Sequence, residues 1–315
     1  MKMRYIRYYI AGIGILILFL TTEFCFGQQD PMYTQYMFNT QTINPAYAGS
    51  WNSVGFQVLA RQQWVGFEGA PSTQTFSFQM PLKNRNIGVG LNIINDKIGN
   101  EKRVSLFADY SYKVSLFDNT TLRMGLSAGF SDYGNSLTDL ILYPDGISDP
   151  VFQSDINHRF LPNAGVGFLM ENPAYYVGLS APKLINSKYS TNSTEFSISG
   201  EIQHFFLTAG YIHEIADGIK FKPTTLLKAT IGAPVELDLS ANFLLKDKFW
   251  VGAMYRTGDS FGFILQWIIN TNLRLGYAID FPTTGIRNHQ YSSHEVMVSY
   301  ELKVLEQKII SPRFF

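Results

Sequence analysis

Residues 249–280, FWVGAMYRTGDSFGFILQWIINTNLRLGYAID, decide the fold. Apolar side chains stand at every second position in three consecutive runs, and short polar stretches at Gly258-Asp259 and Asn270–Asn272 separate the runs. A spacing of two is typical of β-strands with one face on an apolar medium, because successive side chains of a strand point to opposite faces. The stretch therefore predicts neighbouring strands joined by tight turns.

The same pattern extends over the rest of the chain and predicts fourteen strands. The runs cover 54–58, 76–80, 87–93, 104–112, 122–130, 164–168, 175–179, 205–211, 227–231, 237–243, 249–255, 261–269, 273–279 and 296–302. Connections after even-numbered runs are tight, whereas those after odd-numbered runs are often longer, as at Asp132 to Leu161 and Ala181 to Gly200. This alternation is typical of an outer-membrane β-barrel with short periplasmic turns and longer external loops. We therefore expect an all-β barrel of about 14 antiparallel strands in the outer membrane, with both termini in the periplasm.

The opposite face of each run is polar, as a barrel lumen requires. Seven basic and six acidic residues lie there, so the charge is nearly balanced and argues against a strongly ion-selective pore. The same face carries ten glycines, which either let a plug or peptide approach the wall closely or ease the curvature of the barrel. The charged residues are Arg61, Asp109, Lys113, Arg123, Lys222, Lys228, Glu236, Asp238, Arg256, Arg274, Asp280, Glu295 and Glu301.

The composition agrees with a barrel and excludes other classes. Only 16% of residues are charged against roughly 25% in soluble domains, while 15% are aromatic and the formal net charge is zero. A neutral chain has no general affinity for nucleic acid. One cysteine, Cys25, excludes a disulfide scaffold, and no stretch is apolar for long enough to predict a membrane-spanning helix.

The N-terminus has the layout of a secretory signal peptide, with three basic residues, an apolar run at 10–20 and a small residue, Gly27. An uncleaved membrane anchor is the alternative. We divide the chain into a signal peptide at 1–27, a plug-like or leader segment at 28–52, a barrel at 53–304 and a periplasmic tail at 305–315. Segment 28–51 has Asp30 as its single charge and several large rings. We expect it to dock in the lumen or beneath it, although a plain leader into the first strand is an equal alternative.

Motifs for chemistry are sparse. Ser293-His294-Glu295 begins like a zinc-protease motif, but Val298 stands where the second histidine belongs. The loop acids Asp145, Asp149 and Asp155 do not have calcium-loop spacing. We therefore predict no catalytic residues, no metal and no cofactor, and no enzyme activity. An outer-membrane hydrolase with serine, histidine and an acid on neighbouring strands stays open.

Several long motifs resemble the PorP/SprF family of the Bacteroidetes type IX secretion and gliding system. They are DPMYTQYMFNTQTINPAYAG at 30–49, RQQWVGFEGAP at 61–71, HFFLTAGY at 204–211 and FWVGAMYR at 249–256. The resemblance covers nearly all of the chain after the signal peptide. It marks as family hallmarks, for partner binding or for closing the barrel, Tyr36, Phe38, Asn44, Pro45, Tyr47, Gly49, Arg61, Trp64 and Gly66.

The resemblance implies a non-enzymatic outer-membrane barrel that supports export or surface attachment of a large secreted protein with a type IX C-terminal sorting domain. It also implies contact with other secretion and gliding components and with outer-membrane lipid, and no nucleic acid. On this reading the lumen receives a segment of the secreted partner beside the inward-facing Arg123, Asp238, Arg256, Arg274, Glu295 and Glu301. A passive transporter of small hydrophobic or polar solutes is the alternative.

Overall fold

The computed structural model describes residues 30–51, 53–82, 86–117, 119–140, 152–190, 197–288 and 290–302. The expected signal peptide, the expected tail, and the loop acids Asp145 and Asp149 lie outside these residues. Within the described ranges, no helix is long and apolar enough to cross a membrane.

The described residues form one closed barrel of fourteen antiparallel strands, as predicted. β1 pairs with β2 and β17, and β10 pairs with β7 and β12, so the sheet has no open edge. β11 continues β10 along β12 and counts with it as one strand. The strands are β1 (Val54–Gln62), β2 (Ser72–Pro81), β3 (Ile87–Ile98), β4 (Glu101–Phe117), β5 (Thr120–Asn135), β6 (Ile156–Glu171), β7 (Tyr175–Ala181), β10 (His204–Tyr211), β11 (His213–Ala216), β12 (Ile219–Thr230), β13 (Glu236–Leu245), β14 (Phe249–Arg256), β15 (Ser260–Ile268), β16 (Leu273–Pro282) and β17 (Ser293–Leu302).

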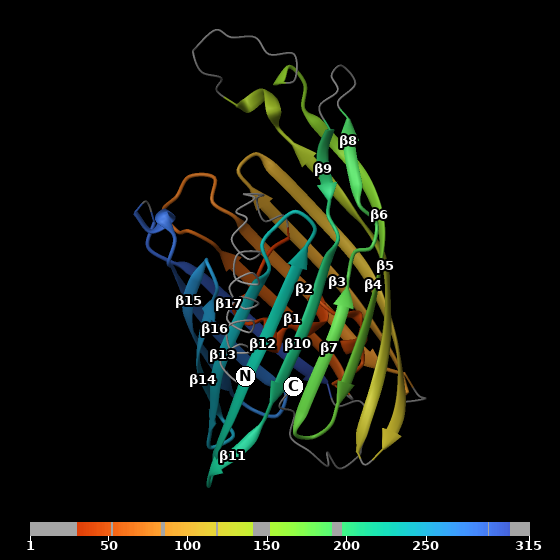
Figure 1. Cartoon of the computed structure of the whole chain (residues 1–315), viewed down its shortest axis with the longest axis vertical. Coiled ribbons are helices and arrows are strands. Elements are labelled where there is room, and N and C mark those ends of the chain that lie inside the picture. The colour runs from red at the N-terminus through yellow and green to blue at the C-terminus, as the bar shows by residue number, and fades with distance from the viewer. Residues whose placement is uncertain are drawn as a thin grey trace, which may run out of the picture.

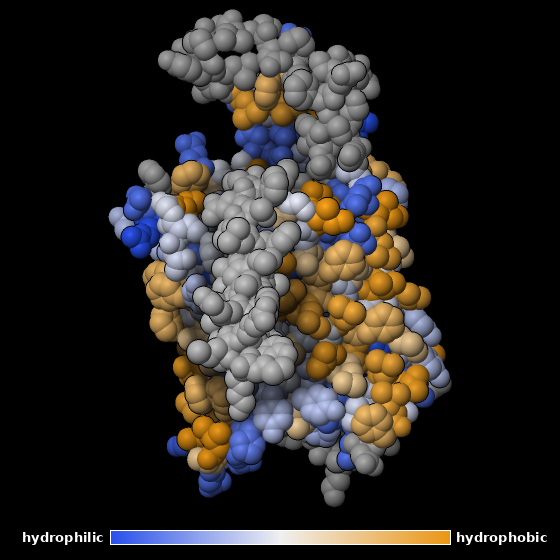
Figure 2. Space-filling model, in the orientation of Figure 1, coloured by the Kyte–Doolittle hydropathy of each residue, from blue (hydrophilic) through white to orange (hydrophobic). Residues whose placement is uncertain are grey.

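The two faces of the wall differ as the sequence period predicts. In β14, exposed and buried residues alternate along the whole strand, so that Val251 and Tyr255 point outward while Trp250 and Arg256 point into the lumen. Figure 2 shows apolar residues over much of the middle of the barrel and hydrophilic residues gathered towards its two ends. This outward apolar band is the surface that contacts lipid in an outer-membrane barrel.

The end of the barrel with the longer connections, called here the outer end, is more ordered than the sequence predicts. β5 and β6 extend into the predicted loop Asp132 to Leu161, and η4 (Leu137–Asp139) follows β5. Tyr133, Leu137, Ile156 and Leu161 form a small apolar cluster there. The other predicted loop, Ala181 to Gly200, contains most of a separate two-stranded sheet of β8 (Ser187–Ser190) and β9 (Ser197–Glu201), seen near the top of Figure 1.

Residues 30–51, called here the N-terminal segment, lie inside the barrel (red in Figure 1). The segment contains three short 3-10 helices, η1 (Tyr36–Phe38), η2 (Thr40–Thr42) and η3 (Pro45–Tyr47). The first turn of η3 forms because Asn44 Oδ1 accepts from the backbone N–H of Ala46 and Pro45 occupies the first helical position. Most residues of the segment are buried, so the lumen serves as their core.

The path of the N-terminal segment bears on the expected position of the two termini. β1 begins and β17 ends at the same end of the barrel, called here the inner end, where the connections are short. Asp30 lies at the opposite, outer end, within 2.9 Å of Lys183 in the loop after β7. The prediction places both termini in the periplasm; the barrel strands begin and end together at the inner end, whereas Asp30, the start of the described N-terminal segment, lies at the outer end.

Candidate functional site: a lumen filled by the N-terminal segment

Asp30 is held at the outer end of the lumen by three basic side chains. Its carboxylate lies 2.9 Å from Lys183 Nζ, 3.2 Å from His204 Nδ1 and 3.8 Å from Arg103 Nη1. Glu201 lies 3.4 Å from the same lysine and balances its charge. Burial alone would raise the pKa of the Asp30 carboxyl, but the three neighbours outweigh this effect and hold the pKa well below its ordinary value.

Arg61 centres a second polar network, which binds the next part of the N-terminal segment. Its Nη1 lies 2.7 Å from Asp280 and 3.3 Å from Glu295, on the two neighbouring strands β16 and β17. The Glu295 carboxylate accepts from the backbone N–H groups of Thr34 and Gln35 at 3.0 and 2.9 Å. The network therefore joins three strands to the segment through charge-assisted hydrogen bonds.

Arg256 forms the third polar anchor. It is almost fully buried and makes a two-pronged contact with Asp238, with donor–acceptor distances of 2.9 and 2.8 Å. Glu236 and Asp259 lie within 3.2 and 3.4 Å of the same guanidinium. Its Nη2 also donates to the carbonyl of Tyr33 at 3.3 Å, so the guanidinium bonds wall and segment together.

A buried lysine of the wall, Lys222, lies among three aromatic rings, of which Phe38 comes from the middle of the segment and Tyr176 and Trp250 come from the wall. Lys222 Nζ lies 5.1 Å from the ring centre of Phe38, 5.6 Å from that of Trp250 and 6.0 Å from that of Tyr176. The ammonium group also lies 3.5 Å from the carbonyl of Met37. Ring faces attract a cation, so this cage compensates part of the cost of burying the charge.

Towards the inner end, contacts between the segment and the wall are uncharged and close. Asn44 Nδ2 donates to the Phe168 carbonyl at 3.0 Å. The backbone of Pro45 and Ala46 lies directly on Gly125, where any side chain would overlap with it. A glycine in the wall is thus required for close approach at this point, which favours the first of the two roles expected for the inward glycines.

Gly49, near the end of the segment, has a backbone conformation that residues other than glycine rarely adopt. Its φ is +69°, and a Cβ atom there would overlap with the backbone of Gly88 in β3. Next to it, Ser111 Oγ donates to the Ala48 carbonyl at 2.6 Å. Two facing glycines therefore let the chain leave the lumen at the inner end and turn into β1.

The structure places the hallmark residues in two regions. Tyr36, Phe38, Asn44, Pro45, Tyr47 and Gly49 belong to the N-terminal segment, and Arg61 binds it from the wall. The Tyr36 hydroxyl lies 2.9 Å from Thr224 Oγ1, and the Tyr47 and Tyr176 rings meet edge to face. Trp64 and Gly66 instead lie in the loop between β1 and β2 at the outer end, where the Trp64 N–H donates to Ser293 Oγ.

The six charged side chains expected to meet a secreted partner lie inside the barrel, and each has a neighbour of opposite charge within the same chain. Arg61 and Arg256 have the acidic neighbours described above. Nearer the inner end, Arg123 lies 3.0 Å from Glu171, and Arg274 lies 3.2 Å from Glu301. The expectation that these side chains receive a segment of a secreted partner does not fit this arrangement, because the chain's own N-terminal segment occupies the lumen.

A small cavity of about 50 Å³ remains beneath Asp30. It is lined by Gln41, Asn92 and Asp109, which are hydrogen-bonded to one another, and by Lys183 at its outer side. The rest of the lining is mainly apolar, including Ile43, Phe107 and Phe206, and a space of this size holds at most a few water molecules and no larger solute.

The other residues considered as site candidates in the sequence, His294 and Asp155, form hydrogen bonds with neighbouring residues of this chain. His294 lies on the outer face, where Nδ1 is 2.6 Å from the Tyr277 hydroxyl and Nε2 is 3.0 Å from Ser292 Oγ. The Tyr277 hydroxyl thus lies where a catalytic triad has a carboxylate or amide. Asp155 accepts from the backbone and hydroxyl of Thr138. Within the described residues, no group of three or more His, Cys, Asp or Glu side chains could hold a metal ion.

The sequence did not single out the residues that fix the outer end of the segment. Lys183, Glu201 and His204 lie in or beside the connection between β7 and β10, where no period-two pattern marks which side chains point inward. The available signal was Asp30 itself, because a single charge in an otherwise uncharged, aromatic segment needs a partner once it is buried.

Comparison with known proteins gives one family match. The model of the family described as "Type IX secretion system membrane protein PorP/SprF" matches residues 25–300. No curated protein matches the chain.

Solved outer-membrane barrels are weakly similar. The KdgM porin has 7% identity and a TM-score of 0.40, with 79% of this chain and 99% of that chain covered. A FadL homologue of Pseudomonas aeruginosa has 10% identity and a TM-score of 0.43, with 79% and 89% covered. A triple mutant of the Rhodopseudomonas blastica porin has 10% identity and a TM-score of 0.35, with 79% and 99% covered.

Proposed function

Because the chain belongs to the PorP/SprF family of type IX secretion system membrane proteins, we propose that this outer-membrane barrel supports export or surface attachment of a large secreted protein. The secreted partner that we propose carries a type IX C-terminal sorting domain. The family resemblance in the sequence motivates the partner class, and the barrel itself sets where the partner can bind.

The observation that carries the proposal is the filled lumen. Residues of the N-terminal segment from Met32 to Ala48 are mostly buried and are fixed to the wall at both ends. A secreted partner therefore meets the barrel at its rim and not in an open channel. A passive transporter, in contrast, needs a path for solute that the segment now occupies.

The rim offers an exposed apolar patch for such a partner. Val65 and Phe67 lie in the loop between β1 and β2, and Phe67 is 46% exposed. Tyr291, in the loop before β17, is 88% exposed. The Val65 N–H donates to the Ser292 carbonyl at 2.9 Å, so the two loops are held together.

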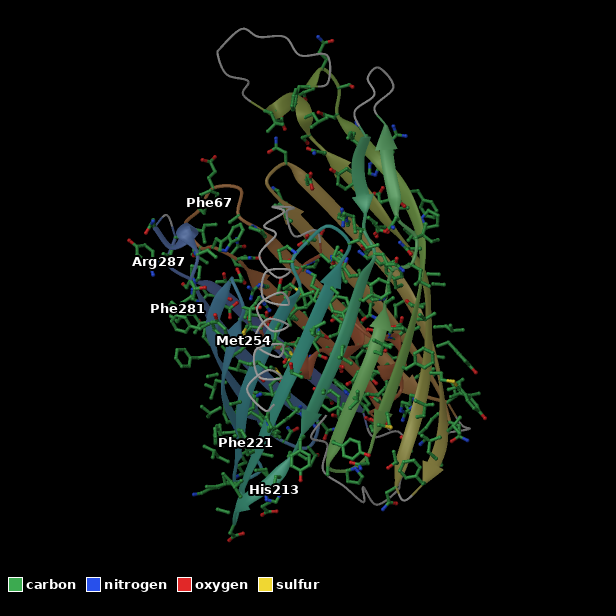
Figure 3. The ribbon with its side chains drawn as sticks, in the orientation of Figure 1. Phe67, His213, Phe221, Met254, Phe281 and Arg287 are labelled. Atoms are coloured by element: carbon green, nitrogen blue, oxygen red, sulfur yellow. The ribbon has the colours of Figure 1, made fainter. Side chains whose placement is uncertain are left out.

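We call Val65, Phe67 and Tyr291 the rim patch. Phe67 is labelled in the upper part of Figure 3. Aromatic side chains exposed in this way are typical of protein interfaces.

Affinity purification tests the proposal. A tagged chain is solubilised from the outer membrane in mild detergent, and co-purifying proteins are identified by mass spectrometry. We expect a large exported protein with a type IX sorting domain, and we expect Phe67→Ser with Tyr291→Ser to reduce its recovery. Phe117→Ser is the control, because Phe117 lies at the inner end and its exposure of 64% falls between those of Phe67 and Tyr291.

Two outcomes would contradict the proposal. Reproducible recovery of the barrel alone in gentle detergent argues against a stable secreted partner. Uptake or conductance of small solutes by the purified chain in vesicles, with the N-terminal segment intact, favours the transporter.

A further inference from the structure

The N-terminal segment crosses the lumen from the outer end to the inner end. Its first described residue, Asp30, is bound at the outer end by Lys183. Its last residues lie at the inner end, where the Ala48 carbonyl accepts from Ser111. β1 then starts at Val54, beside Leu302 at the end of β17. The chain therefore traverses the barrel once before it forms the first strand of the wall.

The longer connections identify the outer end with the cell surface, because outer-membrane barrels have short periplasmic turns and longer external loops. Asp30 thus lies at the surface side, while β1 begins and β17 ends on the periplasmic side. We propose that the N-terminus of the mature chain is exposed at the cell surface, on the opposite side of the membrane from the end of the last strand.

The reach of the chain supports this assignment. After removal of the predicted signal peptide at 1–27, the residues Gln28 and Gln29 precede Asp30. Two residues span at most about 7 Å. The apolar band of an outer-membrane barrel is about 25 Å tall. The end of the chain therefore cannot return to the periplasm through a lumen that the segment already fills.

The contacts of Asp30 hold this end in place. Lys183, His204 and Arg103 reach the carboxylate from three different parts of the outer end. The Glu295 carboxylate then binds the backbone at Thr34 and Gln35. The Asp30 ion pairs and the Glu295 hydrogen bonds are therefore the first contacts with the wall that follow the N-terminal end.

Cysteine labelling on whole cells tests the inference. The chain has one cysteine, Cys25, and it lies in the predicted signal peptide, so a new cysteine is the single reactive site of the mature protein. Gln29→Cys probes the N-terminal end. Ile231→Cys, in the outer connection between β12 and β13 and not part of the rim patch, is the control for surface exposure, and Asp217→Cys, in the exposed turn between β11 and β12, is the control for the inner side. A membrane-impermeant maleimide is added before and after permeabilisation.

We expect the cysteines at positions 29 and 231 to react in intact cells to the same extent and the cysteine at position 217 to react only after permeabilisation. The inference is wrong if position 29 behaves like position 217. It is also wrong if the unsubstituted chain reacts, because Cys25 would then still be attached. Where position 29 stays unreactive under both conditions, an epitope inserted between Gly27 and Gln28 gives the answer: antibody binding to intact cells supports the inference, and binding only after permeabilisation overturns it.

Discussion

The two ends of the N-terminal segment are held by different physical means. The outer part, Asp30–Gln35, is bound by charge, through the clusters around Asp30, Arg61 and Arg256. The inner part, Asn44–Gly49, is bound by neutral hydrogen bonds, ring packing and contact with wall glycines. Charge contacts respond to protons and to competing ions, whereas close packing does not. The comparison indicates that the outer part can be released under conditions that leave the inner part in place.

The largest expected effect comes from removing one side of a buried charge pair in the outer part. Arg256→Met leaves the buried Asp238 without its cation and removes one of the two cations beside Glu236. We expect a loss of about 3–5 kcal/mol in the free energy of unfolding, because an uncompensated buried charge is costly. Denaturant unfolding of the purified barrel in lipid vesicles measures it.

Two variants control this prediction. Adding Asp238→Leu to Arg256→Met is expected to recover part of the stability, since both buried charges are then replaced by apolar groups. Lys220→Met breaks an exposed pair with Asp247 and is expected to cost about 1 kcal/mol or less. Equal losses in Arg256→Met and Lys220→Met would show that the outer charges do not hold the segment.

A smaller effect is expected from crowding the inner part. Gly125→Val places a side chain where the backbone of Pro45 and Ala46 now lies. Overpacking of this kind costs about 1–3 kcal/mol. We expect lower thermal stability and faster proteolysis of the segment, without a dependence on salt.

Gly285→Val is the matched control, because a Cβ atom at Gly285 meets no other atom within 4 Å. A Gly125→Val barrel as stable as the Gly285→Val barrel would mean that the inner part is not held by close contact with this strand.

The smallest effect is expected from pH and separates the two parts. The pKa of Asp30 is held below its ordinary value of about 4, so its ion pairs stabilise the docked segment above that pH and the stabilisation is lost as the pH falls below it. Amide hydrogen exchange, corrected for the intrinsic rate, should therefore show constant protection of residues 32–35 from pH 8 to about 5 and weaker protection below about 4.

The amides of Asn44 and of residues 46–48 provide the internal reference, and their protection should change little over the same range. Asp30→Asn should reproduce at pH 7 the exchange that the unsubstituted chain shows in acid. If both parts lose protection together, then the segment undocks as a single unit and the comparison between its ends fails.

The sequence predicts the wall of this molecule better than its contents. Each run of alternating residues, such as 249–255 or 261–269, became a strand of the barrel, because the membrane imposes one apolar face on every strand. The inward position of Arg61, Arg256 and Glu295 followed from the same alternation. The alternation of apolar residues ends where the strands leave the membrane. The extensions of β5 and β6 beyond Asp132 and Leu161 are therefore predicted as loop.

The sequence predicts that the N-terminal segment is buried, but it does not predict in which direction the segment runs through the lumen. A neutral segment with many rings needs burial, and Gly125 and other inward glycines leave room for it. No local pattern shows that Asp30 reaches Lys183 across 153 positions of the chain. That contact depends on the closed barrel, which brings the connection after β7 over the outer mouth.

The path of the N-terminal segment also constrains how the molecule is assembled. A chain that starts at one mouth of a ring and joins its wall at the other is threaded through it. The seam between β1 and β17 comprises nine residue pairs, Val54 with Leu302 to Gln62 with His294, and joins the first strand to the last. If β1 paired with β17 before the N-terminal segment was in place, the N-terminal end would have to pass through the lumen of a closed barrel. The simpler order is that the sheet closes around the N-terminal segment, so that barrel closure and docking of the segment occur together.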